Sequence, residues 1–88
     1  MPRFYFGVRD GPRFFADDEG RELDSLDAAE REAVTAAAQI GRDRLTKGDA
    51  RAVTVEVRNE HGQWVLTVTV SVELHRVEPE SEPEPPRA

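Results

Sequence analysis

The sequence predicts an α+β domain of β-β-α-β-β order, in which one helix packs on one face of an antiparallel sheet. Apolar residues alternate with polar ones near the start of the chain and again in its second half, which is typical of half-buried strands. Between these stretches, one segment repeats its apolar residues at helical spacing. We expect a single α+β domain over residues 1–76 and a disordered acidic tail, rich in proline and glutamate, over residues 77–88.

The first hairpin is expected at the N-terminus. Phe4, Phe6 and Val8 fall on one face at a period of two, which predicts a strand. A turn signal follows at residues 10–12, and the next four residues can return as a short second strand. The polar, glycine-broken segment 17–24 is then expected to be a loop.

A helix is expected to begin at Asp24 or Ser25, either of which can cap its first turn, and to stop at Gly48. Small side chains dominate its apolar stripe, so the large core residues must come from the strands. The stripe comprises Leu26, Ala29, Ala33, Ala36, Ala37 and Ile40, with Val34, Ala38, Gly41 and Leu45 beside it.

The second hairpin is expected to place Val57 opposite Trp64 and to leave residues 59–62 as its loop. On this register the last strand runs to His75, past the end of its partner strand. The inward face comprises Val53, Val55, Val57, Trp64, Leu66, Val68, Val70, Val72 and Leu74.

The overhang of the last strand is the candidate self-association strand. An unpaired row of backbone groups on an apolar strand attracts another strand, which is either the N-terminal strand of the same chain or a second copy. We expect the second copy, and therefore a homodimer. The strand comprises Ser71, Val72, Glu73, Leu74 and His75.

The outer face of the sheet is either an ordinary solvated surface or a docking face for a protein partner of unknown identity. Its candidate residues are Tyr5, Thr54, Val65, Thr67 and Thr69.

Basic residues gather around the end of the expected helix, where they complement its dipole. They are also candidate phosphate contacts, although the formal net charge of -6 argues against a nucleic-acid partner. The four residues are Arg42, Arg44, Lys47 and Arg51.

We expect the protein not to be an enzyme, because the sequence predicts no catalytic, cofactor-binding or metal site. The chain has no cysteine, and its two histidines, His61 and His75, have no evident partners for a metal site. The acidic segment 17–32 does not match the calcium-binding loop pattern, so we interpret it as a solvated loop and helix start.

The sequence contains no apolar run near the roughly 18 residues that a membrane span needs. Charged residues also interrupt the first ten positions, where a signal peptide requires an apolar run. We therefore expect a cytoplasmic protein without a membrane partner.

Three motifs occur in order along the chain: P-R-F-Y-F-G-V-R-D-G, then D-D-E-G-R-E-L with S-L-D-A-A-E-R-E-A, and then V-T-V-E-V-R-N-E-H-G-Q-W-V-L-T-V. Over about residues 2–70 they resemble the small bacterial domain-of-unknown-function family 6894, a resemblance that implies no known activity. Gly7 and Asn59 depart from that pattern, which commonly has a polar residue and an aspartate there. The aromatic hairpin, D-x-x-G and L-x-x-A helix are similar, at fold level, to HicB-type antitoxins.

These observations lead us to expect an uncharacterised, non-catalytic interaction or regulatory module that associates with itself. The alternative is an antitoxin-like or nucleic-acid-associated regulator, which the HicB-like outline and the basic residues after the helix would favour.

Overall fold

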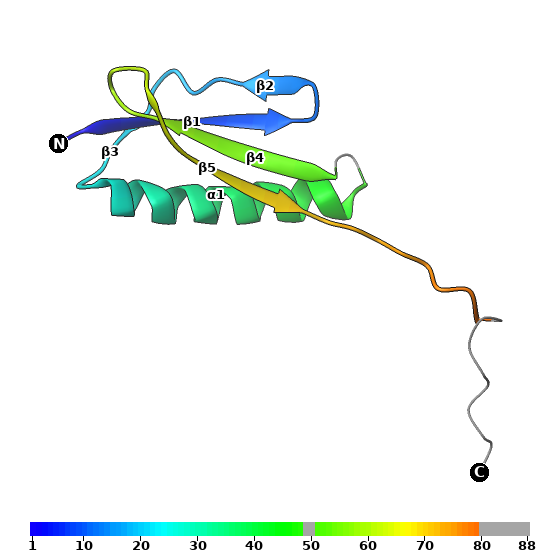
Figure 1. Ribbon diagram of the computed structural model, residues 1–88. Helices are drawn as coiled ribbons and strands as arrows, with labels where there is room; N and C mark the ends of the chain where they lie inside the picture. The colour runs from blue at the N-terminus through cyan, green and yellow to red at the C-terminus, as the bar shows by residue number, and fades with distance from the viewer. Residues whose placement is uncertain (49–50, 80–88) are drawn as a thin grey trace, which may run out of the picture.

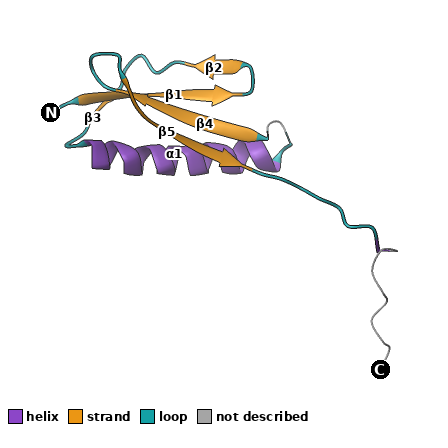
Figure 2. Cartoon of the chain, viewed as in Figure 1, coloured by secondary structure: helices purple, strands orange, loops and turns teal. Residues whose placement is uncertain are grey.

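A computed structural model describes residues 1–48 and 51–79. It shows one helix packed along one face of an antiparallel sheet, which confirms the α+β class (Figures 1 and 2). The strand order is β2-β1-β4-β5, and β3 pairs with β1 as well. The elements are β1 (Arg3–Asp10), β2 (Arg13–Phe15), β3 (Arg21–Glu22), α1 (Leu26–Thr46), β4 (Ala52–Arg58) and β5 (Trp64–Ser71).

The segment after β2, expected to be a loop, contains the additional short strand β3. Asp17 fills the gap between β2 and β3 along the edge of β1, because its Oδ2 accepts a hydrogen bond from the Phe6 N–H at 3.0 Å. Its Oδ1 accepts from the N–H groups of Glu19 and Gly20, each at 3.1 Å. One acidic side chain of this segment therefore joins the loop to the sheet.

The helix begins and ends close to where the sequence predicts. Ser25 is the N-cap, and its hydroxyl accepts a hydrogen bond from the Ala28 N–H at 3.2 Å. Past the last turn, Gly48 adopts a φ of 75° and donates its N–H to the Leu45 carbonyl at 3.2 Å. The positive φ explains why a glycine stands at this stop.

The core lies between α1 and the central strands. Its members are Phe4, Ala29, Ala33, Ala37, Val55 and Val57, with Val53 fully buried beside them. The alternation predicted for β4 is thus confirmed. The helical stripe is only partly right: Leu26 and Val34 are about half exposed, at 49% and 50%, whereas Gly41 and Leu45 are buried.

The register expected for the second hairpin is wrong by two residues. Val57 pairs with Leu66 rather than with Trp64, and a β-bulge follows, so that Trp64 pairs with Arg58. The bulge puts Trp64 opposite an outward-facing residue, and Trp64 is 59% exposed rather than inward. Val65 packs against the core cluster instead.

The expected overhang of the last strand is also corrected. With the shifted register, Ser71 pairs with Ala52, and the Val72 N–H donates to the Arg51 carbonyl at 3.0 Å. Strand β5 ends at Ser71, and the chain leads away from the sheet after it (Figure 1). Residues 80–88 of the expected acidic tail lie outside the described residues.

Within residues 1–48 and 51–79, no helix combines the length and the apolar character that crossing a bilayer requires.

Candidate interaction surfaces

The two edges of the sheet differ. On the β1 side, the edge is broken into the three-residue β2 and the two-residue β3, with Asp17 between them. On the other side, the eight residues of β5, W-V-L-T-V-T-V-S, form an edge with no charge and no proline, regular from Leu66 to Ser71 and bulged at Val65, and no other described strand pairs with it. Such an edge offers its backbone groups to a further strand.

The backbone hydrogen bonds show which amides of β5 are free. Because Val72 donates to Arg51, every second amide counted back from Val72 faces β4 in the antiparallel ladder. The amides of Thr67, Thr69 and Ser71 therefore point away from β4, at the open edge.

The side of the helix next to this edge is apolar. A Cβ at Gly41 would stand 3.1 Å from Cγ1 of Val70, so the helical row containing Gly41 lies over β5. One and two turns earlier in that row, Ala38 and Val34 are exposed. Three half-buried β5 side chains, Leu66, Val68 and Val70, border the same strip.

The outer face of the sheet, opposite α1, carries a network centred on a buried acid. The Glu56 side chain is only 9% exposed, and its Oε2 accepts a hydrogen bond from Nε of Arg9 at 2.9 Å. The Arg9 guanidinium lies 4.9 Å from the Phe14 ring centroid, and that of Arg58 lies 5.1 Å from the Trp64 centroid. This face is therefore already covered in part by its own arginines and aromatic rings.

The predicted partner-face residues are distributed unevenly. Thr54 and Thr69 share a hydroxyl hydrogen bond of 2.8 Å on the outer face, and Thr67 is exposed. Tyr5 is half-buried with its ring against Gly20. Val65 does not belong to this face, because the bulge turns it toward the core cluster.

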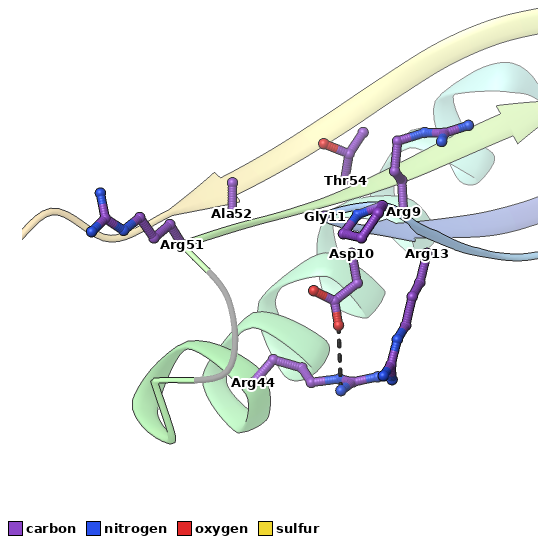
Figure 3. A pocket seen from close by; sticks show the side chains of 9 residues that line it. Arg9, Asp10, Gly11, Arg13, Arg44, Arg51, Ala52 and Thr54 are labelled. Carbon is purple, nitrogen blue, oxygen red and sulfur yellow. Dashed lines mark ion pairs between the residues drawn. The ribbon is translucent and has the colours of Figure 1, made fainter.

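A cavity of about 820 Å³ opens where the β1–β2 turn, the start of β4 and the last turns of α1 meet (Figure 3). Asp10, whose side chain is 9% exposed, forms an ion pair of 3.3 Å with Arg44 at this place. The Arg44 guanidinium also lies 5.9 Å from the Phe15 ring centroid. The four arginines of the lining are Arg9, Arg13, Arg44 and Arg51.

Only two of the predicted phosphate contacts meet at this cavity, namely Arg44 and Arg51. Lys47 instead forms an ion pair of 3.2 Å with Asp43, and Arg42 is exposed outside the lining. Arg9 and Arg13 were not predicted, because only the hairpin turn brings them to the end of the helix.

The segment Ser71–His75 borders a second cavity of about 650 Å³, together with Leu45 and Arg51. Leu74 is 80% exposed there. His75 contacts Glu73 at 3.6 Å, and His61 contacts Glu60 at 3.9 Å, both on exposed surfaces. Among the described residues, no three histidine, aspartate or glutamate side chains are grouped to hold a metal ion.

The family model for the domain of unknown function DUF6894 matches residues 3–71. The chain belongs to this family. No curated protein and no solved structure is significantly similar to the chain. The DUF6894 match begins at the first residue of β1 and ends at the last residue of β5, so it contains the whole sheet, the helix and the open edge.

Gly7 and Asn59, the two positions expected to depart from the DUF6894 pattern, each have a structural role. A Cβ at Gly7 would meet the Phe14 ring, so the glycine gives that ring its place on the sheet. The Asn59 side-chain oxygen accepts hydrogen bonds from the N–H groups of His61 and Gln63, at 2.9 and 3.0 Å, and thereby orders the β4–β5 loop.

Proposed function

We propose that the protein is a non-catalytic interaction module that associates with a second copy of itself through the free edge of β5. The observation that carries the proposal is the contrast between the two edges: one is broken and the other is long, uncharged and open. Monomeric proteins normally protect such an edge with charge, proline, a β-bulge or a covering element; β5 has a bulge at Val65, but its stretch from Leu66 to Ser71 has neither charge nor proline.

The proposed partner is a second copy of the chain, because the β5 edges of two copies can pair with each other. When two β5 strands pair in antiparallel orientation, the outward N–H groups of Thr67, Thr69 and Ser71 donate to carbonyl oxygens of the partner's β5. The sheet then continues from one copy into the next. This pairing also brings the exposed Val34 and Ala38 of each helix toward the partner. Apolar burial along the strip then adds to the backbone hydrogen bonds.

A proline in place of Thr67 tests the proposal. Proline removes an amide that faces the open edge and leaves the hydrogen bonds to β4 in place, so an edge strand tolerates it. We expect the full-length protein to sediment as a dimer at micromolar concentrations and Thr67→Pro to sediment as a monomer with unchanged far-ultraviolet circular dichroism. Thr67→Ala, which keeps the amide, is the matched control and should remain dimeric.

A second pair of variants tests the helical strip. Val34→Glu places a charge beside the edge and should weaken the dimer at least tenfold, whereas Thr35→Glu adds the same charge one residue away, on an exposed side of α1. Two results would contradict the proposed interface. One is a wild-type protein that stays monomeric up to a concentration of about 100 μM, and the other is a dimer that Thr67→Pro leaves intact.

A further inference from the structure

The regular part of β5, together with the residue that follows it, has nearly the same sequence in both directions. The stretch is L-T-V-T-V-S-V, and Thr69 is its middle residue. A valine stands on each side of Thr69, then a hydroxyl residue, and then a branched aliphatic residue. The three mirrored pairs are Val68 and Val70, Thr67 and Ser71, and Leu66 and Val72. A strand with this symmetry presents matching side chains to an antiparallel copy of itself.

The free backbone groups of the edge have the same middle residue. The outward amides belong to Thr67, Thr69 and Ser71. A register displaced toward the start of β5 would pair one of these amides with the bulge at Val65. A register displaced the other way would pair one of them with residues past Ser71, where β5 ends. Only an axis beside Thr69 therefore uses all three outward amides within the regular part of the strand.

The helix places a small side chain at the same level. A Cβ at Gly41 would stand 3.1 Å from Cγ1 of Val70, and α1 runs in the same direction as β5 (Figure 1). A helix rises about 1.5 Å per residue and a strand about 3.4 Å, so Ala38 lies near the level of Thr69. Ala38 is exposed. A small residue at this position allows the helices of two copies to approach each other closely.

We propose that the two-fold axis of the dimer passes beside Thr69, an inference that rests on the proposed function. On the outer face, Thr69 then faces Thr69 of the second copy. The Thr54 hydroxyl already shares a hydrogen bond of 2.8 Å with that of Thr69, so four hydroxyl groups from two copies form one row across the joined sheet.

The same axis covers an exposed apolar residue on the helix side of the sheet. Val72, which follows the last residue of β5, is 51% exposed in the single copy. With the axis beside Thr69, Val72 lies opposite Leu66 of the second copy, and the two side chains bury apolar surface against each other.

Engineered cysteines test the position of the axis, because the chain has no cysteine of its own. Hydrogen-bonded partners in an antiparallel ladder have Cα atoms about 5.5 Å apart, within the range of about 4.4–6.8 Å that a disulfide bridges. Thr69→Cys should therefore form a disulfide-linked dimer when the full-length protein is oxidised mildly and separated on a non-reducing gel.

Thr67→Cys and Ser71→Cys are the matched controls, since all three positions lie on the outer face and are exposed. In each control dimer, the two cysteines would lie about 14 Å apart along the strands, so cross-linking should be at least tenfold slower. A mixture of the two control proteins should nevertheless cross-link, because Thr67 of one copy faces Ser71 of the other. Circular dichroism of the three variants shows whether the fold is kept.

Two results would overturn the position of the axis: self-cross-linking of Thr67→Cys or Ser71→Cys that is faster than that of Thr69→Cys, or no cross-linking by any single variant. The proposed function is tested separately by Thr67→Pro. If Thr67→Pro abolishes a dimer in which Thr69→Cys does not cross-link, the axis is wrong and the β5 interface stands. A wild-type protein that remains monomeric contradicts both.

Discussion

The Phe14 ring lies directly over Gly7 of the neighbouring strand: a Cβ at Gly7 would stand 2.6 Å from Cζ of Phe14 and 2.8 Å from its Cε1. Phe14 pairs with Arg9, whose guanidinium covers the ring and contacts Glu56. A missing side chain on β1 thus lets a ring from β2 rest on the sheet, and the ring in turn supports the arginine that covers a buried acid.

Replacing Gly7 by alanine should destabilise the protein, although a glycine in a strand is ordinarily less favourable than alanine. The new Cβ overlaps the far end of the Phe14 ring, which is 40% exposed and can shift, so the loss should lie near the lower end of the about 1–3 kcal/mol that overpacking costs. Urea unfolding of Gly7→Ala measures the loss. The loss should shrink in the background of Phe14→Ala, because the clashing ring is gone; an unchanged loss there would show that the contact with Phe14 is not the cause.

Asp17 should contribute stability that is lost at low pH. Burial raises the pKa of its carboxyl, but the hydrogen bonds from the Phe6, Gly20 and Glu19 N–H groups and the charge of Arg21 outweigh it, so the pKa lies below the ordinary 3.8. A carboxyl with a lowered pKa stabilises the fold above its unfolded value, and this contribution disappears as the pH falls through the folded value.

The test measures the melting temperatures of the wild type and of Asp17→Asn from about pH 6 to about pH 2. The amide of asparagine cannot accept hydrogen bonds on both ends, so the variant should melt lower at pH 6. The difference should narrow below pH 3.8. A difference that stays constant over this range would mean that the charge of Asp17 plays no part.

Removal of the helix cap should weaken the fold without changing the surfaces. Ser25→Ala deletes the hydroxyl that accepts from the Ala28 N–H, which costs about 1 kcal/mol at a typical N-cap. Ser25→Asp restores an acceptor and should recover most of the loss in denaturant unfolding. Self-association should be unaffected by either variant, since the capping hydroxyl belongs to neither β5 nor the exposed Val34 and Ala38 of α1.

The single tryptophan reports the bulge in β5. Trp64 is 59% exposed and lies beneath the Arg58 guanidinium, so its fluorescence should resemble that of an indole in water and should be quenched readily by acrylamide. An inward Trp64, as the alternation pattern alone predicts, would emit at shorter wavelength and resist quenching. Thr67→Pro, measured in parallel, shows whether association alters the signal.

The inward face of β4 could be predicted from the sequence, whereas the register of the second hairpin could not. Pairing Val57 with Trp64 or with Leu66 differs by two residues, and both arrangements leave the same valines inward. The hydrophobic pattern therefore does not distinguish between the two registers. The loop decides it, since Asn59 accepts hydrogen bonds from two later amides and lengthens the turn.

The two errors at Trp64 and Val65 have one physical cause. Strict alternation assumes an uninterrupted ladder, but the irregularity between Val57 and Arg58 exchanges the faces of Trp64 and Val65.

The arginines of the cavity could be predicted only in part, because some of them are distant in sequence. Arg44 and Arg51 are close in sequence to the end of the helix, whereas Arg9 and Arg13 reach it only because β1 and β2 turn back at the same place.

The unequal edges of the sheet also set the size of any assembly. A chain with two open edges can add copies at both sides without limit, as fibre-forming sheets do. Here Asp17 and the short strands β2 and β3 interrupt the edge on the β1 side, so a pair joined through β5 would have no further open edge of that length within residues 1–48 and 51–79. Growth of the proposed assembly would then stop at two copies, because a sheet with one blocked edge cannot extend as a fibre.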